Sequence, residues 1–218
     1  MNVLALDTST DCLSVALAVG SEIQTLAYPG LRQHADRVLP MIEQLLAEAA
    51  LSCQQLDAIV YGRGPGSFTG LRIACSVAQG LGFAHDKPLY PVSGLAAMAW
   101  DALGEGASVL ALIDARMQQV YWGYFTGVSF EVAEQVSSPD AVRVYATNPV
   151  KIVGVGLEGY EDVLRQTIVA PMVMVRAATP SAGTLIRLVQ AGHVQPVAAA
   201  DARPVYIRDQ VTGGVSGG

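Results

Sequence analysis

Apolar runs with the spacing of strands open the chain. Residues 3–7 (VLALD) form one such run, and residues 13–19 and 22–28 form two more, separated by Gly20 and Ser21. Short apolar runs bounded by turn residues predict β-strands, and a two-residue turn containing glycine predicts that the strands beside it pair as a hairpin. We therefore expect the first 28 residues to form a β-meander of three strands.

After the predicted meander, two segments have apolar residues at helical spacing. Apolar residues recur at intervals of three and four between residues 34 and 50, and again between residues 69 and 85. These intervals place the apolar side chains on one face of a helix. Buried strands are predicted at residues 57–62 and 89–92, and Ser93 is a suitable N-cap for a short helix that ends near residue 103.

The second half of the chain repeats this order in a weaker form. Gly104 and Gly106 predict a hinge, and Asp114 follows the apolar run VLALI much as Asp7 follows VLAL. Such internal similarity indicates a duplicated unit. The elements predicted after the hinge are strands at 108–113, 120–125, 130–136 and 151–154 and helices at 158–165 and 181–191.

The predicted order of elements, a meander followed by alternating helices and strands, occurs twice in the chain. This repeated order is typical of the superfamily that contains actin, hexokinase and the Hsp70 ATPase. The fold class predicted is therefore α/β, with two ASKHA (ribonuclease H-like) lobes, each a mixed sheet with flanking helices. We expect an N-terminal lobe at residues 1–103, a smaller C-terminal lobe at 104–210 and a disordered tail at 211–218.

The composition of the chain indicates which kinds of partner it can bind and in which compartment it is expected. Hydrophobic residues make up 51% of the chain and charged residues 15%, and the mean hydropathy is +0.37. This apolar balance indicates either a surface covered by another chain or a compositional bias. A net charge of −6 with 13 Lys and Arg residues leaves no basic stripe for RNA, so any contact with tRNA is expected to be indirect. Scattered cysteines and the lack of a spanning segment predict a cytoplasmic protein that does not enter a membrane.

A glycine-rich turn, GRGPGSFTGLR at residues 62–72, leads from a predicted strand into a helix. Backbone N–H groups at a helix N-terminus favour an anion, so Gly64, Gly66 and Ser67 are candidates for a nucleotide phosphate. The simpler interpretation is a tight connection in which the glycines supply unusual backbone angles and Ser67 or Thr69 caps the helix. No lysine follows the last glycine, as a Walker loop requires. We favour the structural interpretation for the chain alone.

The remaining polar residues predict no catalytic residue and no metal site. Asp7 and the residues after it could face a phosphate-bound metal, but an Asx-type or Ser/Thr-type turn is the better interpretation because no glycine follows the aspartate. His34, His85 and His193 each lack a second ligand at helical spacing. Neither a nucleophile elbow nor a zinc motif is present in the sequence.

The helix at residues 69–85 is apolar around almost its whole circumference, which indicates that it is covered on more than one side. Leu39 widens the apolar stripe of the preceding helix in the same way. We expect the two helices to share an outward surface that a similar helix pair of a partner covers, burying about 800 Å² per side. The alternative is that they cover only each other and their own lobe. The predicted interface residues are Val38, Met41, Ile42, Leu45, Leu71, Arg72, Cys75, Ala78, Gln79 and Gly82.

Several segments resemble the TsaB (YeaZ) family. They are LALDTST, HADRVLPMIEQLL, GRGPGSFTGLR, IDARMQQVYWGYF and PVYIRD, and together they extend over almost the whole chain. The resemblance implies a non-catalytic subunit that is required for N6-threonylcarbamoyladenosine at position 37 of tRNA. It also implies binding to the TsaD paralogue together with the TsaE ATPase, and a homodimer when the chain is isolated.

The same resemblance bears on cofactors. Where TsaD has two metal-binding histidines after the corresponding strand, this chain has Gly94 and Met98, neither of which binds a hard metal. The chain is expected to hold no cofactor of its own, with ATP or ADP only at the partner interface. A scaffold subunit is therefore the favoured function. The alternative is an independent nucleotide-binding enzyme of the ATPase or kinase type, and a peptidase is a third class that these residues do not support.

Overall fold

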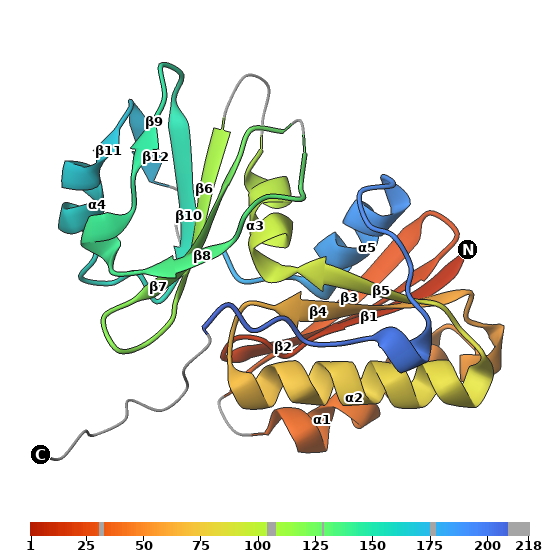
Figure 1. Ribbon diagram of the computed structural model, residues 1–218. Coiled ribbons are helices and arrows are strands. Elements are labelled where there is room, and N and C mark those ends of the chain that lie inside the picture. Colours follow the sequence, from red (N-terminus) through yellow and green to blue (C-terminus); the bar gives the residue numbers. More distant parts are fainter. Residues whose placement is uncertain (31–32, 104–107, 128, 175–177, 209–218) are drawn as a thin grey trace, which may run out of the picture.

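The computed structural model describes residues 1–30, 33–103, 108–127, 129–174 and 178–208. The first lobe is built on a sheet of order β3-β2-β1-β4-β5, shown in Figure 1. Its strands are β1 (Asn2–Asp7), β2 (Cys12–Val19), β3 (Glu22–Pro29), β4 (Ala58–Gly64) and β5 (Leu89–Ser93). The first three pair antiparallel, and β4 and β5 are parallel to β1. The predicted meander is confirmed.

The second lobe repeats the arrangement of the first. Its sheet has the order β12-β10-β6-β7-β8. The strands are β6 (Ser108–Asp114), β7 (Val120–Phe125), β8 (Gln135–Ser137), β10 (Val150–Val155) and β12 (Met172–Met174). In each sheet an antiparallel meander is extended by two parallel strands beside its first strand. The predicted duplication and the two-lobed α/β class are confirmed.

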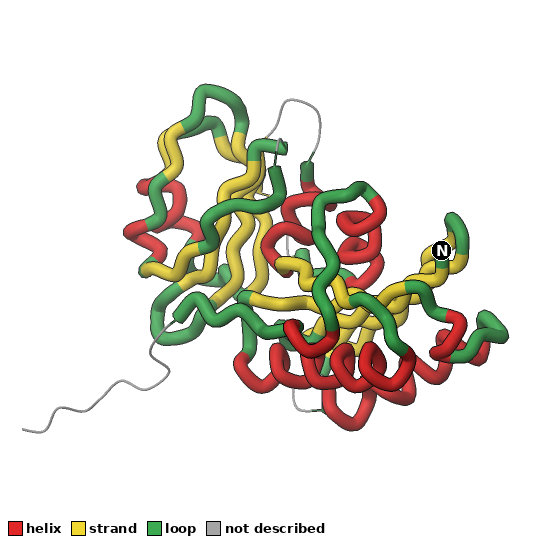
Figure 2. The backbone as a smooth tube through the Cα atoms, turned by 45° about the vertical axis from the view of Figure 1, so that its right-hand side comes forward, coloured by secondary structure: helices red, strands yellow, loops and turns green. Residues whose placement is uncertain are grey.

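Helices cover both faces of the first sheet. Helices α1 (His34–Glu48) and α2 (Phe68–His85) lie on one face, while α3 (Gly94–Ala102) and α5 (Ala182–Gln190) lie between the two sheets, as Figures 1 and 2 show. The smaller elements are the 3-10 turns η1 (Cys53–Gln55), η2 (Pro139–Ala141) and η3 (Ala199–Asp201), the helix α4 (Glu161–Thr167), and the strands β9 (Val144–Tyr145) and β11 (Ile168–Val169). No helix within the described ranges has the length and apolar character that a membrane span needs.

The boundary between the lobes differs from the predicted one. Helix α5 packs against β1, β2 and β4 of the first sheet, and Val197 pairs with Leu89 at the end of β5. Residues 182–197 therefore do not belong to a C-terminal lobe of 104–210. The reason is apolar burial, because Leu185 and Ile186 of α5 join the core that fills the space between the sheets. Gly104, Gly106 and the predicted tail at 211–218 lie outside the described residues.

The strand predicted at residues 130–136 is shorter than expected. Only Gln135–Ser137 pairs with β7, because Phe130 turns into the core between the lobes. Its ring lies 5.1 Å from that of Trp100 and 5.0 Å from that of His193. Burial of this aromatic ring replaces strand pairing at residue 130.

Candidate functional site: the loops of the cleft and the outer face of α2

The two candidate phosphate loops are bound to each other. The N–H of Ser67 donates to the carbonyl oxygen of Ser9 (2.7 Å), and the hydroxyl of Thr8 donates to the carbonyl oxygen of Gly70 (2.5 Å). A Cβ at Gly66 would lie 2.3 Å from the Ser9 oxygen. This close approach explains the glycine, since any side chain there would separate the loops.

Asp7 forms the predicted Asx turn. Its Oδ1 accepts from the Ser9 N–H (3.0 Å) and from the Ser9 hydroxyl (2.8 Å). The side chain is fully buried, and Oδ2 has no hydrogen-bond partner. Burial raises the pKa of Asp7 to about 6, although the two bonds from Ser9 and the charge of His34 oppose the increase. The carboxylate closes a turn beneath the loops and does not line the cleft.

The glycine-rich turn has a clear structural role. Gly64 has a φ of +114°, and a Cβ there would lie 3.0 Å from the Val205 carbonyl oxygen. The Ser67 hydroxyl caps α2 by accepting from the Gly70 N–H (3.4 Å). The predicted cap is confirmed, while the participation of Gly64, Gly66 and Ser67 in a nucleotide site stays a prediction.

A cleft of about 670 Å³ separates the lobes. It is lined by residues 9–11 and 65–68 of the first lobe, 113–117 of the second, and 205–208 from the end of the described chain. Its lining includes both acidic and basic side chains, among them Asp11, Asp114 and Arg208. The lining thus provides no single-sign field that would select a multiply charged anion.

The hairpin between β6 and β7 has an unusual backbone. Arg116, Met117 and Gln118 have φ values of +61°, +54° and +57°, in the left-handed region that L side chains seldom adopt. Asp114 holds the turn, since its Oδ1 accepts from the Arg116 N–H (2.9 Å) and its Oδ2 lies 3.3 Å from the Arg116 guanidinium. Arg116 also reaches Asp11 of the first lobe (3.8 Å). Three successive left-handed residues without glycine could not be predicted from the sequence.

Most of the predicted interface residues face inward. Seven of them are buried by their own lobe, and all of these except Leu71 and Gly82 belong to the core of the first sheet, together with residues such as Leu4 and Ile59. These seven are Val38, Ile42, Leu45, Leu71, Cys75, Ala78 and Gly82. The prediction that they form an outward surface is wrong. Met41 and Gln79 are half-buried, and Arg72 is exposed.

The outer face of α2 consists of other residues. It carries the half-buried Ile73, Val77 and Leu81 and the exposed Phe68, Ser76, Gly80, Phe83 and Ala84, and we call this set the outer face. Phe83 is 64% exposed and Phe68 40% exposed. A Cβ built on Gly80 meets nothing within 4 Å. The helix is apolar on two sides, as its composition indicated. Ile73, Val77 and Leu81 pack at the edge of the first-lobe core, so the exposed residues form the open part of the outer face.

Comparison with known proteins identifies the family. Residues 29–163 match the family model described as "TsaD: tRNA N6-adenosine threonylcarbamoyltransferase". The "tRNA threonylcarbamoyladenosine biosynthesis protein TsaB" of Haemophilus influenzae is 36% identical over 97% of this chain and 95% of that protein. The protein of the same name from Escherichia coli is 34% identical over 97% and 96%.

The chain belongs to the TsaB (YeaZ) family. The solved structure titled "YeaZ from Pseudomonas aeruginosa" is 39% identical and superimposes with a TM-score of 0.81, covering 94% of this chain and 99% of that one. Another, an "uncharacterized protein with similarity to peptidase YEAZ" from the same organism, is 40% identical with a TM-score of 0.84, covering 95% and 99%. The fold of the TsaB family therefore extends over both lobes of this chain.

Gly94 and Met98, the positions that were matched to the metal-binding histidines of TsaD, are both closely packed in this chain. Met98 is buried in the core between the lobes, and a Cβ at Gly94 would lie 3.0 Å from Pro180. Ser93, at the start of α3, donates to Glu134, which also pairs with Arg63 (3.2 Å). Within the described ranges, no three His, Cys, Asp or Glu side chains are grouped so that they could hold a metal.

Proposed function

We propose that this chain is a non-catalytic subunit required for N6-threonylcarbamoyladenosine formation in tRNA, and that it acts by binding and activating a TsaD-like paralogue. Family membership supports the pathway, because the relatives from Haemophilus influenzae and Escherichia coli are both named as biosynthesis proteins for this nucleoside. The match to the TsaD model supports a paralogous partner with the same lobes. A TsaE-like ATPase joins the pair, and tRNA contacts the chain only through the assembly.

The main support for the proposal is the exposed apolar character of the outer face of α2. A helix already buried on one side exposes two phenylalanines and several small residues on the other, next to branched apolar residues that are half-buried. Exposed apolar surface of this kind, interrupted by an arginine, has the composition of a protein interface. Gly80 and Ala84 allow the backbone of a second helix to approach closely. The face suits a helix pair of a paralogue built on the same plan.

The same face supports self-association. When the paralogue is absent, a second copy of the chain offers an identical apolar helix, so that two copies form a homodimer through α2 with isologous contacts. Binding of the paralogue then competes with this homodimer. ATP or ADP binds only at the paralogue interface, near the glycine-rich turn that precedes α2.

A reconstitution assay tests the role. Unmodified tRNA is incubated with the substrates of the reaction and with the TsaD-like and TsaE-like proteins of the same genome, with and without this chain. Threonylcarbamoyladenosine is measured by mass spectrometry of the digested tRNA. We expect formation only when the chain is present and none from the chain alone. Undiminished formation without it, or transfer by the chain alone, contradicts the proposal.

The cleft favours a second candidate function, an independent nucleotide-binding enzyme of the ATPase or kinase type. Its volume of about 670 Å³ is within the usual range for small-molecule sites. Against this function, Ser67 N–H and Asp7 Oδ1 are engaged within the chain. Calorimetry of the isolated chain with ATP and Mg²⁺ separates the two candidates. Micromolar binding with turnover would favour the enzyme.

A further inference from the structure

The end of the described chain follows a path from one lobe to the other. After α5, Val197 and Leu89 exchange two backbone hydrogen bonds (2.8 and 3.0 Å). The side-chain amide of Gln79 on α2 then donates to the carbonyl oxygens of Ala199 (3.3 Å) and Ala202 (3.1 Å). Residues 197–202 are thereby fixed along β5 and α2 of the first lobe.

The next residues are fixed at the carboxyl end of β4. The Arg203 N–H donates to the Tyr61 hydroxyl (3.0 Å), which donates in turn to the Arg203 carbonyl oxygen (3.1 Å). The Val205 N–H donates to the carbonyl oxygen of Arg63 (2.8 Å). Arg63 also forms the ion pair with Glu134 of the second lobe, whose side chain is only 6% exposed. The chain end and the Arg63–Glu134 ion pair thus meet at Arg63.

Tyr206 joins the outer face of α2. Its ring centroid lies 5.2 Å from that of Phe68, and its hydroxyl accepts from Arg72 Nε (3.2 Å). The Arg72 guanidinium lies over the Phe68 ring, 3.9 Å from the centroid. We call these three residues the aromatic cluster. Tyr206 is 42% exposed, and tyrosine and arginine are the residue types that most often dominate the binding energy of interfaces.

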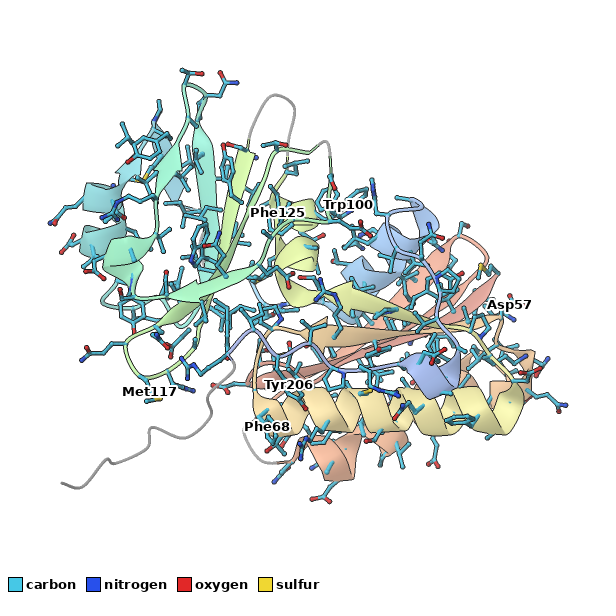
Figure 3. The ribbon with its side chains drawn as sticks, viewed as in Figure 1. Asp57, Phe68, Trp100, Met117, Phe125 and Tyr206 are labelled. Atoms are coloured by element: carbon cyan, nitrogen blue, oxygen red, sulfur yellow. The ribbon has the colours of Figure 1, made fainter. Side chains whose placement is uncertain are left out.

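Arg208 completes the path on the second lobe. Its guanidinium donates to the side-chain oxygen of Gln119 and lies 3.6 Å from the sulfur of Met117. Both partners belong to the left-handed hairpin between β6 and β7, a conformation that needs support from its surroundings. In Figure 3, Met117, Tyr206 and Phe68 lie along the same side of the molecule.

We propose that residues 203–208 form a strap that ties the first lobe to the β6–β7 hairpin and supplies Tyr206 to the docking face, so that partner binding at α2 and the arrangement of the lobes are coupled. The partner is the TsaD-like paralogue, so the coupling rests on the proposed function. The aromatic cluster fits a partner surface that offers an apolar pocket bordered by a carboxylate or carbonyl acceptor for Arg72. Coupling is reciprocal, so a bound partner in turn holds the strap and the hairpin in place.

Hydrogen exchange of the isolated chain tests the strap without any partner. Ala115 and Gln119 are the reporters, because the Ala115 N–H donates across the hairpin to the Gln119 oxygen (2.9 Å) and the Gln119 N–H to the Arg116 oxygen (3.1 Å). Truncation after Pro204 removes residues 205–208 of the strap, and truncation after Arg208 is the matched control. Arg208→Ala is the smaller change, which leaves every contact with α2 intact. We expect the truncation after Pro204 and Arg208→Ala to speed exchange of these amides about 5-fold or more, and the control to leave it unchanged.

Calorimetry with the paralogue tests the coupling. The hydrogen bonds of the Arg208 side chain go to the β6–β7 hairpin, yet we expect Arg208→Ala to weaken binding about 5-fold or more. Unchanged exchange and unchanged affinity in Arg208→Ala overturn the strap, whether or not the longer truncation folds. Faster exchange with unchanged affinity leaves a strap that is not coupled to docking and overturns the coupling. If the wild-type chain does not bind the paralogue, the proposed function fails and the coupling with it, while the exchange rates still decide whether the strap exists.

Discussion

Gly80 gives a sharp test of the docking face, because it occupies the middle of that face and touches nothing else. A Cβ at this position meets no atom within 4 Å, so both Gly80→Ala and Gly80→Arg are accommodated by the folded chain. Alanine and arginine are both better helix formers than glycine, and each is expected to stabilise the monomer by up to about 1 kcal/mol. Thermal unfolding checks this part of the prediction.

The two variants should differ in binding. Alanine leaves the face small and apolar, so Gly80→Ala is expected to bind the paralogue as the wild type does. Arginine places a charge and a long side chain in the centre of the interface, and a buried charge without a partner costs about 3 kcal/mol or more. This corresponds to a Kd more than about 100-fold weaker in calorimetry. In analytical ultracentrifugation Gly80→Arg should be monomeric and Gly80→Ala dimeric. Equal affinity and equal self-association of the two variants would refute a docking site on α2.

Three further variants test the site's internal structure. Asp7 has a raised pKa in the folded state, so its contribution to stability is present below about pH 4 and lost as the pH rises through about 6. In urea unfolding, Asp7→Asn should therefore raise the free energy of unfolding by up to about 3 kcal/mol at pH 7 and change it little at pH 4. A decrease at pH 7 would contradict this. Gly66→Ala places a Cβ 2.3 Å from the Ser9 oxygen and should lower the free energy of unfolding by about 1–3 kcal/mol; a neutral effect would mean that the two loops are not in close contact. Arg63→Met leaves the buried Glu134 without its charged partner, although Ser93 still donates to it. The change should cost about 3 kcal/mol, partly restored by Glu134→Gln in the same chain; the absence of any restoration would argue against the ion pair as the cause.

Periodicity was sufficient for the first lobe because each of its elements is long and has one buried side. The meander, the helices α1 and α2 and the parallel strands β4 and β5 all lie within a few residues of their predicted ranges. The second lobe was less predictable, since β9, β11 and β12 have only two or three residues and carry no periodic signal. Phe130 shows the same limit, because tertiary burial of one ring decided where a strand begins.

The docking residues could not be selected from the sequence alone. A helix that is apolar all around has no pattern that distinguishes the side facing its own sheet from the side facing a partner. Leu71 and Phe83 are equally hydrophobic in the sequence, yet Leu71 is 1% exposed and Phe83 64% exposed. Tyr206 was missed for another reason, since its contact with Phe68 spans most of the chain length and leaves no local signal.

The proposed function requires that the paralogue covers the outer face of α2. Hydroxyl-radical footprinting with mass spectrometry measures this directly, by comparing the oxidation of exposed aromatic side chains with and without the TsaD-like protein. Phe83 is 64% exposed, and Tyr145 of the second lobe, at 74%, is a matched reference far from α2 in the fold. The account predicts that the paralogue protects Phe83 and Phe68 and leaves Tyr145 unchanged. Protection of Tyr145 with undiminished oxidation of Phe83 would contradict it.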